Sequence, residues 1–215
     1  MGFIDPRTIL VILAGFVIAI AVHEFSHAAV ARLLGDRTAQ QAGRLTLNPI
    51  RHLDPFGSLL ILLTVASGAP GIGWGKPVPV NPRALRYGRA GMALVSAAGP
   101  FSNLVLATIV LAVASHVDLP APIAEADVQT LVLLNVSLCA FNLLPIAPLD
   151  GFGVAVGVLP QPLAYQVARL GRYGSAILLL LVFSASIIRV SLLGLILRPI
   201  IRVLLTVIIR IAGAF

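Results

Sequence analysis

The chain has 215 residues, of which 59% are hydrophobic and only 11% are charged. An ordinary soluble domain carries about 25% charged residues, so this composition excludes a chain that covers itself with polar surface, and it indicates lipid as the solvent. The net charge of +7 predicts membrane topology and no nucleic-acid partner, because basic residues beside membrane helices stay on the cytoplasmic side. Apolar runs recur from residue 8 to the C-terminus, which predicts a single membrane-embedded domain over residues 1–215.

The first apolar run extends from Ile9 to about Leu34. At 1.5 Å per residue, its roughly 26 residues would form about 39 Å of helix, enough to cross a bilayer. A signal peptide is the alternative, since Arg7 precedes a hydrophobic stretch that ends at Val22. We favour a spanning helix, because charged residues occupy the place where a small-residue cleavage site would be expected.

Residues 32–55 form a polar, basic segment that we place on the cytoplasmic side. The next apolar run, Phe56 to Ala66, has about 11 residues, which is too short for a straightforward span. It leads into a stretch rich in glycine and proline, and a second basic segment follows at residues 76–89. The chain is therefore expected to return to the side it left, through a re-entrant or interfacial segment.

Two further spans are predicted in the middle of the chain, from Ala90 to about Ser115 and from Val128 to about Ile146. The loop between them, residues 116–127, has acidic residues and no Lys or Arg, so we place it outside. Small residues in the first of these spans would let a neighbouring helix approach closely.

Beyond Gly151, Arg169 and Arg172 predict another cytoplasmic stretch, and the apolar region from Gly174 to Leu197 is broken by Arg189. The last segment has a polar residue at every fourth position: Arg198, Arg202, Thr206 and Arg210. This stripe is typical of an interfacial amphipathic helix or of a span whose stripe faces protein. Together the segments predict an all-α fold, a multi-pass transmembrane helical bundle with about five or six membrane segments, one of them re-entrant.

The strongest chemical signal is the string His23-Glu24-Phe25-Ser26-His27 inside the first apolar run. On a helix the two imidazoles lie one turn apart and can hold one metal ion, while Glu24, about 100° round the helix, can take a proton from water on that metal. A hydrogen-bonded polar knot between helices is the alternative. A charged group inside an apolar segment costs about 2.5–3.5 kcal/mol, so an uncompensated knot should be rare.

A catalytic zinc takes three protein ligands and keeps one position for water, so a third ligand is needed. Cys139 is the only cysteine, which excludes a cysteine cluster. Asp150 is the candidate, since it follows two prolines that would break the third span and expose backbone to a buried or wet cavity. An Asp-Gly turn at the membrane surface is the alternative interpretation of this residue.

Four other polar residues have weaker signals. His52 and Asp54 could supply a ligand or a gate, but we favour solvated loop residues. Asn103 and Asn142 are intramembrane amides, which usually serve helix association. Asn142, eight residues before Asp150, also fits a role in polarising the scissile carbonyl or in holding the substrate backbone.

These motifs resemble the site-2 protease family of intramembrane zinc metalloproteases, in its compact prokaryotic branch without appended domains. The resemblance depends on the HEFSH string, on residues 98–103 (AGPFSN) and on residues 142–151 (NLLPIAPLDG), in that order. Residues 47–55 and 73–82 extend it over nearly the whole chain. Phe152 departs from the family pattern, which often has Gly-Gly or Gly-Ser after the aspartate.

The resemblance implies that His23, His27 and Asp150 bind Zn2+, that Glu24 is the general base and that Asn142 assists the transition state. It implies a zinc metalloendopeptidase that hydrolyses peptide bonds of single-span membrane proteins by zinc-activated water. We expect a multi-pass protein of the prokaryotic inner or plasma membrane, with His27 in the cytoplasmic half of the bilayer.

Two alternatives come from other classes: a membrane metal-ion carrier and a catalytically silent membrane scaffold. Buried His and carboxylate also hold ions in transporters, but a single Glu beside the first His suits a base better, and no inverted repeat is visible. A silent scaffold is disfavoured because every catalytic residue type is present. The natural substrate, the cleavage site and the oligomeric state do not follow from the sequence.

Overall fold

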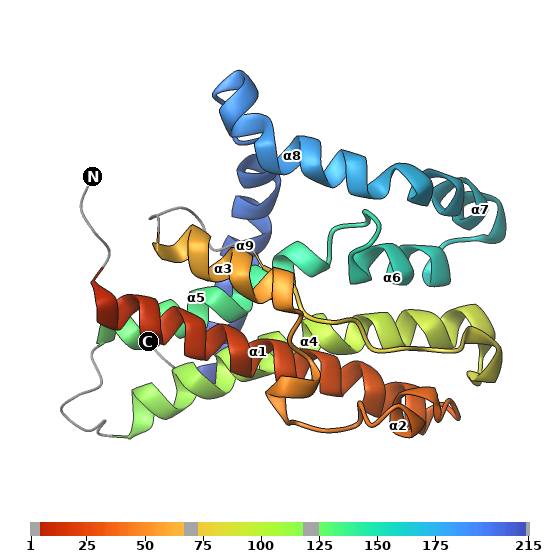
Figure 1. The fold of residues 1–215 in the computed structure, drawn as a ribbon, viewed down its shortest axis with the longest axis horizontal. Helices are drawn as coiled ribbons and strands as arrows, with labels where there is room; N and C mark the ends of the chain where they lie inside the picture. The colour runs from red at the N-terminus through yellow and green to blue at the C-terminus, as the bar shows by residue number, and fades with distance from the viewer. Residues whose placement is uncertain (1–4, 67–72, 118–124, 214–215) are drawn as a thin grey trace.

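The computed structural model describes residues 5–66, 73–117 and 125–213, and these are mostly helical (Figure 1). Within these ranges there is no β-strand, and one isolated antiparallel bridge joins Leu53 and Gly75. The longer helices are α1 (Pro6–Leu33), α4 (Gly88–His116), α5 (Glu125–Asn142), α8 (Gly174–Ile188) and α9 (Leu192–Ala212). The shorter ones are α2 (Thr38–Gln41), α3 (Pro55–Ala66), α6 (Asp150–Val158) and α7 (Gln161–Leu170).

Membrane-length helices confirm the all-α, multi-pass fold class. Four stretches of the described chain are long and apolar enough to cross a bilayer: Pro6–Leu33, Gly88–His116, Gln161–Ile188 and Leu192–Ala212. The predicted spans at residues 9–34 and 90–115 match α1 and α4 closely, and the short apolar run becomes the 12-residue helix α3. Gly68, Pro70 and Gly71 of the glycine-rich stretch, and Asp118 of the acidic loop, lie outside the described residues.

The prediction and the structure differ most after residue 142. The third span was expected to continue to Ile146, but α5 ends at Asn142. Pro145 explains the difference, because it lacks the N–H that a helix needs and disfavours helical geometry in the residue before it. The stretch around Arg169, expected to be a cytoplasmic segment, belongs to helix α7, and α6 was not anticipated. Arg189 does end α8, in the left-handed conformation with φ 57°.

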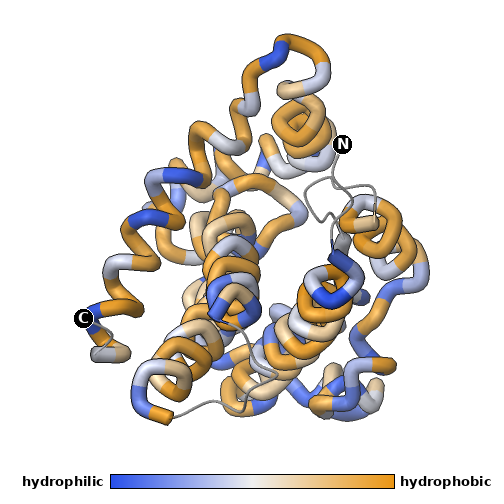
Figure 2. The backbone as a smooth tube through the Cα atoms, turned by 90° about the vertical axis from the view of Figure 1, so that its left-hand side faces the viewer, coloured by the Kyte–Doolittle hydropathy of each residue, from blue (hydrophilic) through white to orange (hydrophobic). Residues whose placement is uncertain are grey.

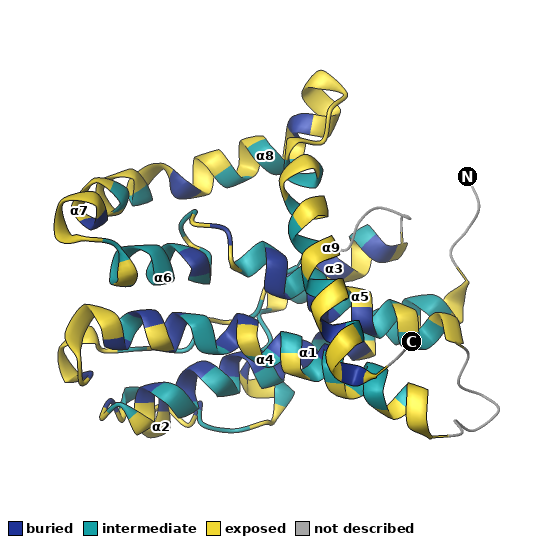
Figure 3. Ribbon diagram, turned by 180° about the vertical axis from the view of Figure 1, so that it is seen from behind, coloured by how far each residue is buried: buried dark blue, intermediate teal, exposed yellow. Residues whose placement is uncertain are grey.

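The centre of the bundle consists of α1, α4 and α5, which pack against one another and are seen nearly end-on in Figure 2. One buried cluster joins α1 to α3 through Phe16, Ile20, Ile61 and Val65. Buried residues concentrate on the central helices, whereas α7 and α8 are largely exposed (Figure 3). Exposed leucines, isoleucines and Phe183 on α8 are expected where the surrounding solvent is lipid.

Helix α9 crosses the direction of α1, α4 and α5, and one of its faces packs on α4 and α5 through Ile208 (Figures 1 and 2). Its polar stripe lies on another face, and all four members are exposed: Arg198, Arg202, Thr206 and Arg210. Within the described chain the stripe therefore does not face protein. This arrangement favours the interfacial interpretation of the last segment.

A buried carboxylate joins the end of α1 to the segment that precedes α4. Asp36 is only 1% exposed and accepts hydrogen bonds from the backbone N–H of Thr38 (2.9 Å), its hydroxyl (2.5 Å) and the backbone N–H of Asn81 (2.7 Å). Burial raises the pKa of Asp36, but these hydrogen bonds outweigh it, so the pKa lies below its ordinary value. Asp36 thereby anchors residues 78–81, which pass beside α1.

We expect Asp36→Ala to lower the free energy of unfolding by about 1–3 kcal/mol, because buried donors lose their acceptor. The folded-state pKa is lower than the unfolded one, so the stabilisation is fully present above the unfolded pKa. It is lost as the pH falls through the folded pKa, so the difference in stability between wild type and variant should begin to shrink below about pH 4. Thermal unfolding of the detergent-purified protein across pH measures this, and equal stability of both proteins at pH 7 would contradict it.

Candidate metal centre

Helix α1 carries two histidines and a glutamate into the middle of the bundle. His23, Glu24 and His27 are 5%, 8% and 8% exposed, although they lie in an otherwise apolar helix. The four-residue spacing puts both imidazoles on the same side of α1, with ring centroids 4.7 Å apart. Burial of these polar groups indicates that each has a partner in the bundle.

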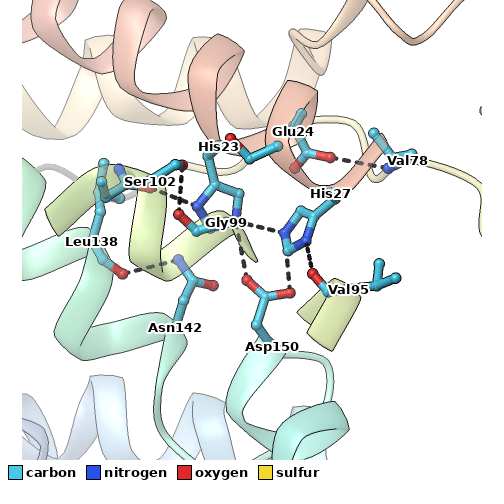
Figure 4. Close-up of polar contacts among 12 residues, drawn as sticks. His23, Glu24, His27, Val78, Val95, Gly99, Ser102, Leu138, Asn142 and Asp150 are labelled. Carbon is cyan, nitrogen blue, oxygen red and sulfur yellow. Dashed lines mark hydrogen bonds and ion pairs between the residues drawn. The ribbon is translucent and has the colours of Figure 1, made fainter. Parts of the chain in front are cut away.

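Asp150 reaches the two histidines from the other side. The chain leaves α5 at Asn142, turns through residues 143–149 and enters α6 at Asp150. The Asp150 Oδ2 lies 3.0 Å from Nε2 of His23, its Oδ1 lies 3.3 Å from Nε2 of His27, and the two Nε2 atoms are 3.0 Å apart (Figure 4). The structure thus brings the three predicted metal ligands together, with Asp150 inside the bundle and not in a surface turn.

The hydrogen bonds at the Nδ1 atoms of His23 and His27 determine whether the Nε2 atoms, which face Asp150, carry a proton or a lone pair. Nδ1 of His27 lies 2.7 Å from the backbone carbonyl oxygen of Val95, which can only accept, so Nδ1 carries the proton. Nδ1 of His23 lies 2.7 Å from the side-chain Oδ1 of Asn103 and donates in the same way. Both Nε2 atoms therefore direct lone pairs at Asp150, whose buried Oδ2 accepts no hydrogen bond.

This donor set fits a zinc ion. Three groups that each present a lone pair at 3.0–3.3 Å repel one another unless a cation lies among them. Zinc bonds of about 2.0–2.2 Å in a tetrahedral arrangement separate the ligand atoms by about 3.3–3.6 Å, slightly more than the observed spacings of 3.0–3.3 Å. Two histidines and one carboxylate are also a set that catalytic zinc sites use when they keep one position for water.

Helix α4 approaches the cluster through Gly99. A Cβ atom on Gly99 would lie within 3.0 Å of Nε2 of both His23 and His27, so no other residue type fits here without displacing a ligand. Figure 4 shows Gly99 directly beside the two imidazoles. The sequence marked it as one of several small residues for helix packing, which was a correct but unspecific signal.

Glu24 is held by a backbone donor from outside its own helix. Its Oε2 accepts a hydrogen bond of 3.0 Å from the N–H of Val78, and Figure 4 shows the carboxylate directed toward Val78 beside His27. Val78 lies between two prolines, so it is the one residue of 77–79 with a backbone N–H to offer. The segment is fixed upstream, where the N–H of Lys76 donates to the carbonyl of His52 at 2.7 Å.

His52 and Asp54 lie outside the cluster of metal-ligating atoms in the described structure. His52 is completely buried, and its Nε2 lies 2.7 Å from the carbonyl oxygen of Thr46, so the interpretation of a solvated loop residue is wrong for it. Asp54 accepts a hydrogen bond of 2.9 Å from the N–H of Gly57 and so caps the first turn of α3. Both residues have structural partners.

Asn142 ends α5 and lies close to the cluster (Figure 4). Its Nδ2 donates to the carbonyl oxygen of Leu138, one turn earlier, at 3.0 Å. The amide group has a second N–H that this hydrogen bond does not use. Its role in the transition state stays a prediction.

The fold and the site define a class, that of multi-pass membrane proteins in which two buried histidines and a half-buried aspartate could hold a cation beside a buried glutamate. The chain is 40% identical over 173 residues to the Bacillus subtilis protein named "Putative zinc metalloprotease YwhC". The aligned region covers 77% of this chain and 76% of that protein. The chain is 32% identical over 183 residues to "Putative zinc metalloprotease Rip2" of Mycolicibacterium smegmatis, with 84% and 69% covered. A Mycobacterium tuberculosis protein of that same name is 37% identical over 145 residues, 66% of this chain and 55% of that protein.

No family model and no solved structure matches the chain. The extent and identity of the relatives are nevertheless sufficient, and the chain belongs to the site-2 protease family of zinc metalloproteases. It is a membrane-embedded hydrolase that uses zinc. The family, the enzyme class and the cofactor predicted from the sequence are confirmed.

We expect Gly99→Ala to lose zinc binding, because the added methyl group occupies the space against both Nε2 atoms. Val105→Ile is the matched control, since it adds one methylene to an exposed side chain of the same helix. Zinc content per chain, measured by atomic absorption after gel filtration, should fall at least tenfold in Gly99→Ala and stay at the wild-type value in the control. A wild-type zinc content in Gly99→Ala would show that the close approach of α4 at residue 99 is not required for zinc binding.

Proposed function

We propose that this zinc metalloprotease cleaves single-span membrane proteins within or beside the bilayer of the prokaryotic plasma membrane. His23, His27 and Asp150 are the zinc ligands, and Glu24 is the general base. The observation that carries the proposal is the convergence of two Nε2 lone pairs and a carboxylate at 3.0–3.3 Å, inside a bundle of membrane-length helices.

The chemistry divides between the zinc and the side chains around it. When bound, zinc supplies a Lewis acid that activates water for attack on a peptide carbonyl. Glu24 takes the proton of that water and later gives it to the leaving amine. The N–H of Val78 holds the carboxylate through Oε2, so we assign the transferred proton to Oε1.

The depth of the site supports a membrane substrate. His23 is 17 residues from the start of α1 and 10 from its end, which corresponds to about 26 Å and about 15 Å of helix. The basic segments that follow α1 favour the cytoplasmic side for the nearer end. A substrate helix must unwind locally at this depth to offer a carbonyl, because its backbone groups are hydrogen-bonded internally.

Glu24→Gln separates chemistry from binding. We expect it to keep about one zinc per chain, because Glu24 is not a ligand, and to lose cleavage of a panel of single-span substrates by at least 100-fold, because an amide cannot take the proton. His23→Ala, in contrast, should lose the zinc itself. Both variants are compared with wild type in detergent for zinc content and for product on gels.

Wild-type rates in Glu24→Gln would refute the assignment of the base. A different outcome would support the ion carrier: wild type binds zinc but cleaves no substrate, and zinc flux in liposomes depends on His23.

Asn142 is proposed to donate its second N–H to the carbonyl oxygen of the scissile bond. We expect Asn142→Ala to lower kcat by about 10²–10³, as for the loss of one oxyanion donor, with KM and zinc content nearly unchanged. Ser102→Ala is a suitable control, because the Ser102 hydroxyl is engaged with the carbonyl of Gly99 at 2.7 Å. A loss of zinc in Asn142→Ala would assign this residue to the integrity of the site.

A further inference from the structure

Two buried amides lie behind His23, on the side away from Asp150. Asn103 of α4 and Asn135 of α5 are 1% and 2% exposed. Oδ1 of Asn103 lies 2.7 Å from Nδ1 of His23, and its Nδ2 donates to Oδ1 of Asn135 at 3.4 Å. Nδ2 of Asn135 in turn donates to the backbone carbonyl oxygen of Leu131 at 2.9 Å. These bonds form one continuous chain from α5 through α4 to α1.

The direction of this chain is fixed at its far end. The carbonyl oxygen of Leu131 can only accept, so Asn135 must present Nδ2 to it and Oδ1 to Asn103. Asn103 must then present Nδ2 to Asn135 and Oδ1 to His23. If either amide were reversed, two donors or two acceptors would face each other in a buried site, which is costly.

The direction of these hydrogen bonds determines the tautomer of His23. An acceptor at 2.7 Å requires Nδ1 to carry the proton, so Nε2 keeps its lone pair and directs it at Asp150. His27 obtains the same restraint from the backbone carbonyl of Val95. Of the two histidines, His23 is the one whose tautomer depends on a side chain that can be changed.

We propose that Asn103 and Asn135 are positioning residues that fix the tautomer of His23 and thereby set the affinity of the site for zinc. The inference rests on the proposed assignment of His23 as a ligand. It goes beyond the ordinary role of intramembrane amides, which is helix association. An association role alone predicts a loss of stability with no change in metal affinity.

The experiment measures zinc affinity by competition with a chromophoric chelator in detergent. Asn103→Leu should bind zinc about 10–100-fold more weakly, as expected when the outer partner of a ligating histidine is removed. Asn135→Leu should weaken binding by a smaller factor, because Asn103 stays but is free to reverse. Thr108→Val is the matched control on α4, since it removes a hydroxyl that bonds only its own helix at Leu104, and it should bind zinc as wild type does.

Asn103→Asp keeps an acceptor for Nδ1 of His23, so it should bind zinc more tightly than Asn103→Leu. Thermal unfolding of the metal-free proteins detects a leucine variant that fails to fold. In that case Asn135→Leu is compared with wild type, because Asn103 is intact in that variant, and wild-type zinc affinity there would overturn the inference. A second readout is the visible spectrum of the Co2+-loaded protein, which reports the ligand field: it should change in Asn103→Leu and stay unchanged in Thr108→Val.

Wild-type zinc affinity in folded Asn103→Leu, or equal affinity in Asn103→Leu and Asn103→Asp, would overturn the inference. The His23→Ala variant separates this failure from failure of the proposed function. If His23→Ala loses zinc while Asn103→Leu does not, the ligand assignment stands and only the positioning role falls. If His23→Ala binds zinc as wild type does, the ligand assignment itself falls.

Discussion

The structure depends on one constraint: three groups that each present a lone pair lie against one another inside a bundle of largely apolar helices. His23, His27 and Asp150 approach to 3.0–3.3 Å. While both imidazoles are neutral and donate outward through Nδ1, no proton is left to lie between the three groups. A cation removes the repulsion and compensates the desolvation of the carboxylate. The burial of these groups is unfavourable in the metal-free protein, and it therefore favours binding of a cation.

Several features of the fold follow from this requirement. Helix α1 supplies two of the proposed ligands by its periodicity. A third side chain on the same face would lie another turn along the helix, so the third proposed ligand comes from a later segment of the chain. It returns through residues 143–149, where Pro145 ends α5 and allows Asp150 to begin a new helix beside the histidines. Helix α4 must approach closely without filling the space, and Gly99 permits this. Close packing continues along α6, where a Cβ on Gly153 would collide with Ser96 of α4.

The sequence predicts those parts of the fold and site that are encoded locally. The spacing of His23 and His27, and the lengths of α1 and α4, follow from periodicity and hydropathy alone. Asp150 could be inferred because few carboxylates lie in apolar surroundings. The hydrogen bonds of Val78 to Glu24 and of Asn103 to His23 could not be inferred, because each depends on which segments meet in space. His52 shows the same limit: a histidine in a polar segment is usually solvated, but here the segment folds back on the bundle and buries it.

The two histidines are restrained by different means, and the difference matters for how the site tolerates change. Val95 holds His27 with a backbone carbonyl, which any residue at that position supplies as long as α4 keeps its path. His23 depends on the side chain of Asn103 and, through it, on Asn135 and α5. The proposed metal centre thus draws on four helices: α1 for two ligands, α6 for the third, α4 for both outer partners, and α5 for the direction of the amide chain. By this proposal, a substitution on α5 that does not contact the metal changes the zinc affinity by reversing the direction of the amide hydrogen bonds.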